Sequence, residues 1–172
     1  MKRLLLCALC VFALSGCEWL KGRSSKDNIE PPADLVEFET SAPVNKVWST
    51  GIGGGIERSG TRPRPVEADG RVFAADLDGS VHAIDLITGR KVWSAETEHR
   101  LSSGVGTGDG LAVVGGLDGE VIALDRDSGG AKWTTTVSSE VLANPVIADG
   151  IVVVRTNDGR VFGLNVGDGS RA

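Results

Sequence analysis

Cys17 is the residue whose surroundings point most clearly to chemistry, namely modification of its thiol. Two basic residues precede an apolar run over residues 4–14, and two small residues stand directly before the cysteine. This order is typical of an export signal that is removed by cleavage, and the run is too short for a permanent membrane span. Cys7 and Cys10 lie within the signal. We therefore expect no disulfide, cysteine metal site or cysteine nucleophile in the mature chain.

The residues Leu14-Ser15-Gly16-Cys17 resemble the bacterial lipoprotein box. The resemblance implies that diacylglycerol is attached to the Cys17 thiol, that residues 1–16 are removed and that the new amino terminus is acylated. Several acyl chains anchor a protein to a membrane stably, whereas one chain holds it only marginally. The alternative is a simple secretory signal with an incidental cysteine. We predict that Cys17 is the site of lipid attachment.

Asp76-Leu77-Asp78-Gly79 could be read as half of a calcium-binding loop. The same stretch recurs 40 and 80 residues later with Gly116 and Thr156 in place of the first aspartate, and the later ligands of such a loop are missing. Asp-Gly pairs are also the residues that tight turns require. We therefore expect a turn at this place and predict no metal site.

Two histidines and two stretches of small residues are weaker candidates for catalysis. His82 takes a strand position that Ile122 and Phe162 take in the recurring stretches, so we expect it to pack between sheets, while His99 is expected to be solvated. The stretches 102–104 (Ser-Ser-Gly) and 53–55 (Gly-Gly-Gly) suggest a nucleophile or a phosphate loop. Neither lies between a strand and a helix, as those motifs require. We predict loops there, no catalytic residue, no cofactor site and no enzymatic activity.

Three stretches of the chain, the first beginning at Ala68, repeat one pattern every 40 residues without insertion. In the first copy Asp69-Gly70 and Asp78-Gly79 enclose an apolar run, and Asp-Gly supplies the positive φ angles of a tight two-residue hairpin. Each copy therefore contains four short strands and three tight turns, with the first strand at about residues 65–68. No helix is expected in these copies.

Strands of the second and third copies are apolar on both faces, as in residues 121–124 (Val-Ile-Ala-Leu) and 151–154 (Ile-Val-Val-Val). A strand with one wet face would alternate between apolar and polar residues. Sheets that are buried on both sides and repeat at this period are typical of a β-propeller, in which each copy forms one four-stranded antiparallel blade. We predict an all-β propeller fold.

Particular residue types fit particular places in such blades. The alanines at 74–75 and the glycines at 115–116 are expected in the crowded inner part, where blades converge. Trp93 and Trp133 are expected on the outermost strands, where they fill the wider space between blades. Arg155 stands where the other copies have a small residue, and a charge is seldom buried alone. We expect it to face the central channel or to pair with a carboxylate of the next blade.

Both ends of the repeated region indicate an incomplete ring. Residues 45–50 (Asn-Lys-Val-Trp-Ser-Thr) resemble a fourth strand without its first three, and the third copy stops before its tryptophan. Because propellers close with about 4 to 8 blades, we expect a longer protein in which Trp48 packs against C-terminal residues and closes the ring. The last copy is expected to present an unpaired strand and an uncovered apolar face.

The expected organisation follows the chain in six parts. They are a lipoprotein signal peptide (1–16), a lipidated N-terminus with a flexible tether (17–42), an orphan outer strand with a loop (43–58), a blade (59–98), a second blade (99–138) and an incomplete blade (139–172). Arg58, Arg62 and Arg64 are expected in a solvated loop. The chain has 18 basic and 23 acidic residues, so nucleic acid is not an expected partner.

The order of these parts is similar to that of a known family. A lipoprotein box, a tether, the segment VWSTGIGGGI and blades with a shared signature resemble the BamB family, the propeller lipoproteins of the β-barrel assembly machinery of Gram-negative bacteria. In the first blade the signature consists of Ala83, Asp85, Thr88, Gly89 and Trp93. The resemblance implies an eight-bladed, non-enzymatic scaffold, of which this chain would cover about two and a half to three blades.

The resemblance also implies partners and a location. The partners are the periplasmic POTRA domains of the barrel-forming BamA and other subunits of the machinery, and the activity is assistance in the insertion of outer-membrane proteins. The lipid would hold the protein at the periplasmic face of the outer membrane. The residue after the lipidated cysteine, here the acidic Glu18, influences whether a lipoprotein is sorted to the outer or the inner membrane. The docking residues are implied to lie mainly in blades that follow residue 172, and no cofactor or small-molecule substrate is implied.

Two other classes of function stay open on the residues alone. One is a pyrroloquinoline-quinone-type propeller dehydrogenase. Such an enzyme needs ligands for the quinone and for calcium and, in many members, an adjacent cysteine pair, which the mature chain is not expected to contain. The other is a periplasmic ligand-binding propeller lipoprotein. Its binding of a small molecule or polysaccharide, without binding of POTRA domains, would distinguish it from an assembly scaffold.

Overall fold

The computed structural model describes residues 33–36, 42–54, 61 and 63–172 of the 172-residue chain. The chain divides into two compact units, with the boundary after Val44. In the first unit the described residues are exposed and form neither helix nor strand. Cys17, Glu18 and the predicted signal peptide lie outside the described residues. In the described ranges no helix is long and apolar enough to cross a membrane.

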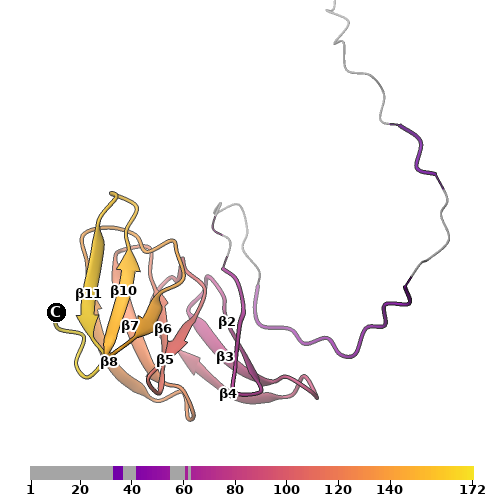
Figure 1. Cartoon of the computed structure of the whole chain (residues 1–172), viewed down its shortest axis with the longest axis horizontal. Coiled ribbons are helices and arrows are strands. Elements are labelled where there is room, and N and C mark those ends of the chain that lie inside the picture. The colour runs from indigo at the N-terminus through magenta and orange to yellow at the C-terminus, as the bar shows by residue number, and fades with distance from the viewer. Residues whose placement is uncertain (1–32, 37–41, 55–60, 62) are drawn as a thin grey trace, which may run out of the picture. The chain divides into compact units, whose positions relative to one another are not determined.

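The second unit contains three antiparallel sheets in the part that the structure describes, and Figure 1 shows them side by side in chain order. Their orders are β1-β2-β3-β4, β5-β6-β7-β8 and β9-β10-β11, so each sheet is a simple meander. The strands are β1 (Val66–Ala68), β2 (Arg71–Ala75), β3 (Ser80–Asp85), β4 (Lys91–Glu96), β5 (Gly106–Gly108), β6 (Leu111–Gly115), β7 (Glu120–Asp125), β8 (Ala131–Thr136), β9 (Val146–Ala148), β10 (Ile151–Arg155) and β11 (Val161–Asn165). The predicted all-β fold with blades every 40 residues is confirmed.

The first turn of each blade is the predicted two-residue hairpin. Between β1 and β2 it consists of Asp69 and Gly70, whose φ angles are +49° and +74°. The Asp-Gly pairs at 109–110 and 149–150 also have positive φ at both residues. This geometry is that of a type I′ turn, whose twist matches the twist of the two strands. The local sequence therefore determines the start of every blade.

The second Asp-Gly of each blade forms a longer turn than predicted. Between β2 and β3 the Asp76 N–H donates to the Ser80 carbonyl at 3.0 Å, and only Gly79 of the intervening residues has a positive φ, +111°. This is a three-residue turn that ends in a glycine bulge. The two-residue hairpin predicted at 78–79 is therefore wrong. The additional residue is Leu77, whose side chain is buried, and the longer turn is what places it inside.

Apolar cores fill both boundaries between the sheets. Ala112 and Val114 of β6 belong to the core that the second sheet shares with the first, whereas Leu111 and Val113 belong to the core that it shares with the third. A strand that is buried on both faces needs apolar residues at every position, which is why β6 shows no alternation. The predicted packing of a blade between two neighbours is confirmed for the second blade.

Neighbouring inner strands approach so closely that glycine is required. A Cβ atom at Gly106 would overlap the Pro145 carbonyl oxygen, and one at Gly108 would lie 2.7 Å from the Ile147 Cβ. β5 therefore carries a side chain only at its central residue, and β9 passes beside it. The crowding predicted at Gly115 is present as well, because a Cβ there would collide with a valine side chain. Gly106 and Gly108 themselves are not among the predicted positions.

Candidate functional site: the turns between neighbouring blades

Each tryptophan of an outer strand lies on a glycine turn of the following blade. Trp93 of β4 donates its indole N–H to the Arg126 carbonyl at 2.9 Å, and its ring packs at 5.9 Å from the Phe73 ring. A Cβ at Gly129 would lie 2.6 Å from the Trp93 ring. The predicted outer position of the tryptophans is confirmed. Trp133 sits on the third blade in the same way, through the Val166 carbonyl and Gly169.

Trp48 occupies the equivalent place on the first blade. Its indole N–H donates to the Leu86 carbonyl at 2.8 Å, and a Cβ at Gly89 would lie 2.6 Å from its ring. The expectation that Trp48 also packs against C-terminal residues stays a prediction, because a ring on an outer strand can contact two sheets at once, as Trp93 contacts Phe73 and the turn of the second blade. The assignment of residues 43–58 to a strand that closes a ring stays a prediction.

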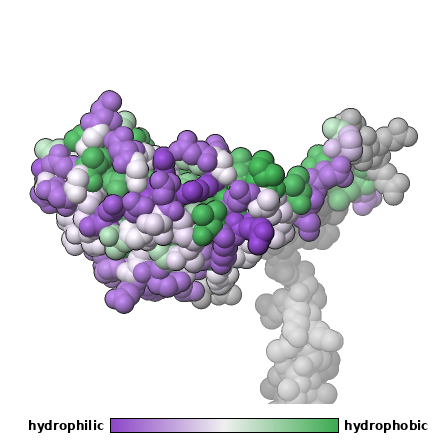
Figure 2. Space-filling model, turned by 90° about the horizontal axis from the view of Figure 1, so that it is seen from below, coloured by the Kyte–Doolittle hydropathy of each residue, from purple (hydrophilic) through white to green (hydrophobic). Residues whose placement is uncertain are grey.

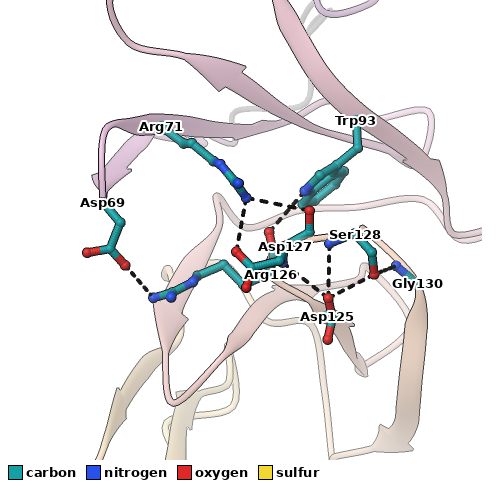
Figure 3. Close-up of polar contacts among 8 residues, drawn as sticks. All are labelled: Asp69, Arg71, Trp93, Asp125, Arg126, Asp127, Ser128 and Gly130. Carbon is teal, nitrogen blue, oxygen red and sulfur yellow. Dashed lines mark hydrogen bonds and ion pairs between the residues drawn. The ribbon is translucent and has the colours of Figure 1, made fainter.

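In the first two blades an aspartate holds the turn that receives a tryptophan, as Figure 3 shows for Asp125. Its Oδ1 accepts the Ser128 N–H at 2.9 Å and the Ser128 hydroxyl at 2.8 Å, and its Oδ2 lies 3.1 Å from Lys132 Nζ. These donors favour the ionised carboxylate, the Ser128 hydroxyl most of all, and lower the pKa of Asp125 to about 2. In the first blade Thr88 lowers the pKa of Asp85 by the same kind of hydrogen bond.

We expect Asp125→Asn to destabilise the chain in a pH-dependent manner. Because the pKa of Asp125 falls from its usual 3.8 to about 2 on folding, its carboxylate contributes stability above about pH 4 that is lost as the pH falls to about 2. Urea unfolding at about pH 6 should give a lower free energy of unfolding for the variant than for the wild type, and this difference should shrink at about pH 3. Asp118→Asn removes a charge from the other turn of β7 and is the control. Equal shrinkage for both variants would contradict the prediction.

Two ion pairs cross the boundary between the first and second blades in Figure 3. Arg71 Nη1 lies 3.0 Å from Asp127 Oδ1, and Arg126 Nη1 lies 2.8 Å from Asp69 Oδ2. Both aspartates are largely exposed, and exposed ion pairs add little stability. Their effect is to align the first hairpin of one blade with the tryptophan-binding turn of the next.

The glycine-rich segment before the first blade lies against β3. His82 is buried, with its Nε2 at 2.8 Å from the Ile52 carbonyl oxygen and its Nδ1 at 2.7 Å from Ser94 Oγ. Because a carbonyl only accepts, Nε2 carries the proton in this arrangement. A Cβ at Gly53 would overlap the Asp76 carboxylate. The histidine and the glycines therefore serve close packing, as predicted for His82 and in place of a phosphate loop.

The residues of the possible calcium loop form a turn, as predicted. Asp76 Oδ1 accepts the N–H groups of Asp78 at 3.1 Å and of Ser80 at 2.9 Å. A carboxylate that binds the backbone of its own loop in this way fixes the turn conformation. Over the residues that the structure covers, no group of three or more His, Cys, Asp or Glu side chains is placed to hold a metal ion.

The serines of the 102–104 stretch are structural, whereas His99 departs from its prediction. Ser102 Oγ donates at 2.9 Å to the Val141 carbonyl, in the connection that leads to β9, and Ser103 Oγ accepts the Gly115 N–H of β6 at 2.7 Å, so both hydroxyls fix the position of the loop. His99 is not fully solvated. Its Nδ1 lies 3.2 Å from Glu120 Oε1, because its connection runs over the next blade.

Arg155 lies exposed at the end of β10, on the face of the third sheet opposite the core residues Val152 and Val154. Neither role predicted for it is seen among the described residues. Of the three arginines expected in a loop, Arg58 and Arg62 lie outside the described part, and the carbonyl of Arg64 accepts a hydrogen bond at 3.2 Å from the Asn144 amide.

Asn144 joins three consecutive blades at their inner ends and is not among the predicted residues. Its Nδ2 donates to the carbonyls of Arg64 and Val105, both at 3.2 Å, and its Oδ1 accepts the Gly104 N–H at 3.0 Å. The equivalent positions in the other copies are Arg64 and Gly104. Because the residue type differs in each copy, the repeat pattern did not predict a role for Asn144. Only the side-by-side position of the inner strands reveals its role.

These features define a class of protein. Four-stranded antiparallel blades, each joined to the next by a tryptophan on a glycine turn, are those of a β-propeller. A family model described as outer membrane protein assembly factor BamB matches residues 77–172, which is more than half of the chain. The chain belongs to this family.

Individual relatives agree with the family. The chain is 44% identical over 125 residues to the outer membrane protein assembly factor BamB of Xanthomonas campestris, an alignment that covers 64% of this chain and 31% of that protein. The crystal structure of BamB from Moraxella catarrhalis matches with a TM-score of 0.59 and 29% identity, over 68% of this chain and 35% of that one. The alignments with curated relatives thus span less than a third of the relatives' length.

A different kind of propeller shares the fold. A quinohemoprotein alcohol dehydrogenase from Pseudomonas putida matches with a TM-score of 0.57 at 22% identity, over 63% of this chain and 19% of that one. At this identity the likeness concerns the fold alone. The blade architecture therefore does not separate a scaffold from a dehydrogenase.

Proposed function

We propose that the chain acts as a non-enzymatic scaffold in the assembly of outer-membrane β-barrel proteins, and that it binds the POTRA domains of BamA and other subunits of the machinery. The observation that carries the proposal is membership of the BamB family over residues 77–172. A scaffold works through its surface. The burial of His82, Ser102 and Ser103 within the packing between blades supports such a role.

Lipid attachment at Cys17 would place this scaffold at the periplasmic face of the outer membrane. The lipoprotein box before Cys17 supports the anchor, and two or more acyl chains are enough for stable membrane attachment. In cells that express the full chain, Cys17→Ser should move the protein from the membrane fraction to the periplasmic fraction. Retention of the variant in outer membranes that have been washed with urea, which removes protein held only by a partner, would contradict the anchor.

Binding to POTRA domains is tested with the full lipidated chain in detergent. We expect the purified POTRA domains of BamA to retain the chain at micromolar concentration, and the Cys17→Ser variant to be retained equally, because docking and anchoring use different parts of the chain. An unrelated lipoprotein is the negative control. Failure of both forms to bind would refute the assembly role, whereas loss with Cys17→Ser alone would show that the lipid mediates the contact.

The same preparation separates the scaffold from a quinone-dependent dehydrogenase. We add pyrroloquinoline quinone with calcium and follow the reduction of an artificial electron acceptor in the presence of alcohols. A scaffold reduces no dye and its melting temperature does not change with the quinone. Dye reduction above the level of a heat-denatured sample would overturn the non-enzymatic assignment.

A further inference from the structure

The first and third sheets share no apolar core in the part of the chain that the structure describes. One core lies between the first and second sheets and the other between the second and third. The packed sheets form a continuous surface on the face of the molecule that Figure 2 shows. In repeats that contact only their neighbours, stability is a sum of repeat terms and neighbour terms. On that basis the first and third blades would affect each other only through the second.

The side chain of Asn144 connects the third blade directly to the first. Asn144 lies just before β9, and its Nδ2 donates to the Arg64 carbonyl of the first blade at 3.2 Å. The same nitrogen donates to the Val105 carbonyl at 3.2 Å, and Oδ1 accepts the Gly104 N–H at 3.0 Å, both in the second blade. One amide group of the third blade therefore binds main-chain atoms of the two blades before it.

The three contacts of Asn144 require both a donor and an acceptor on one short side chain. Two of its partners are carbonyls, which only accept, and the third is an N–H, which only donates. These partners fix the orientation of the amide, with Nδ2 toward the carbonyls. An ionised aspartate has the same shape, but it would place an oxygen that cannot donate against two carbonyl oxygens.

The contact between the three blades depends on close approach of their backbones. A Cβ atom at Gly104 would lie 2.5 Å from the Arg64 carbonyl oxygen and 2.5 Å from Asn144 Oδ1. At Gly106 a Cβ would overlap the Pro145 carbonyl oxygen. The second blade thus has glycine at the places where the neighbouring backbones come nearest. This absence of side chains lets Asn144 reach across the second blade to the first.

We propose that Asn144 couples the first and third blades directly, so that the three blades open as one cooperative unit. Asn144 is half-buried and belongs to neither apolar core, so its hydrogen bonds carry the coupling. Opening of the third blade breaks the contact with Arg64 as well as the contacts with the second blade. Each outer blade is therefore held less firmly once the other has opened.

Amide hydrogen exchange of the full chain tests the coupling, because it reports local opening region by region. In the Asn144→Ala variant we expect exchange about tenfold faster than in the wild type, both in β9 and β10 of the third blade and in β1 and β2 of the first. If the alanine variant is too unstable to measure, Asn144→Ser, whose hydroxyl cannot make all three contacts, takes its place. Unchanged exchange in β1 and β2 would overturn the proposal.

Ser102→Ala is the matched control for this experiment. The Ser102 hydroxyl donates to the carbonyls of Val141 in the third blade, at 2.9 Å, and of Gly115 in the second, at 3.3 Å. Its loss weakens the link between these two blades and leaves the bond to Arg64 in place. We expect faster exchange in the third blade and unchanged exchange in β1 and β2. An equal increase in the first blade for Ser102→Ala and Asn144→Ala would overturn the direct coupling.

Asn144→Asp separates hydrogen bonding from shape. At about pH 7 the new side chain is ionised, so it cannot donate to the carbonyls of Arg64 and Val105. Exchange in β1 and β2 should then rise at least as much as in Asn144→Ala. Exchange at the wild-type rate in this variant would show that the shape of the side chain holds the blades together, and would overturn the proposal. Tryptophan fluorescence confirms that each variant is folded before exchange begins.

Discussion

Gly129→Ala is expected to lower the free energy of unfolding by about 2–4 kcal/mol. Two effects add at this position. The φ angle of Gly129 is +77°, a conformation that costs an L-residue about 1–2 kcal/mol, and the new Cβ would lie 2.6 Å from the Trp93 ring. The ring is held by its own hydrogen bond and by Phe73, so it cannot move away without loss of the core. Urea unfolding of the full chain measures the change.

Gly110→Ala is the matched control for this prediction. Gly110 lies in the same blade and has a φ of +76°, but nothing lies within 4 Å of the position of a Cβ. Its substitution should therefore cost only the backbone strain, about 1–2 kcal/mol. The difference between the two variants isolates the contact with the tryptophan. Equal losses of unfolding free energy in the two variants would show that the Trp93 ring moves aside at no cost. Gly129 would then be needed only for its positive φ.

Trp93→Ala is expected to have the largest effect of any single substitution at the blade boundary, a loss of about 3–5 kcal/mol. The Trp93 side chain is 9% exposed, belongs to the core between the first two sheets and contacts Phe73. Its removal leaves a cavity that the rigid turn at Gly129 cannot fill, and frees the Arg126 carbonyl. The free energy of unfolding by urea, followed by circular dichroism, reports the loss.

Trp93→Phe separates packing from hydrogen bonding at the same position. Phenylalanine keeps an aromatic ring in the core but cannot donate to the Arg126 carbonyl, so a net hydrogen bond of about 1 kcal/mol is lost together with part of the ring area. We expect the free energy of unfolding of this variant to lie between those of the wild type and of Trp93→Ala. A loss of less than about 1 kcal/mol for Trp93→Ala itself would contradict the structural role assigned to the ring.

Features that depend on contiguous residues could be predicted from the sequence. The hairpin at Asp69 and Gly70 follows from positive φ at two adjacent residues, which is a local property. The position of Trp93 and Trp133 on outer strands could be predicted because both follow the last turn of their repeat at the same distance in sequence. The length of the turn at residues 76–79 was not predicted from its Asp-Gly pair, because a glycine with positive φ ends a three-residue turn as well as a two-residue one.

Contacts between blades could not be predicted because they join residues that no local pattern connects. Gly106 is needed where β5 passes Pro145, and Asn144 bridges Arg64 and Val105, but each stands at a position that the other copies fill with a different residue. His99 is paired with Glu120 for the same reason. A repeat predicts what all copies share. The residues that fix one particular boundary are those in which the copies differ.

The tryptophan on its glycine turn has a consequence for how such proteins arise. The first two blades each carry both members of the contact: in the second, Trp133 of β8 lies on the third blade while Gly129 receives Trp93. Duplication of one 40-residue unit within a gene therefore inserts a blade whose two boundaries are complementary from the start. No second mutation is needed to make the new copy fit. Blade number can thus vary in evolution by single duplication events, while individual boundaries acquire their ion pairs afterwards.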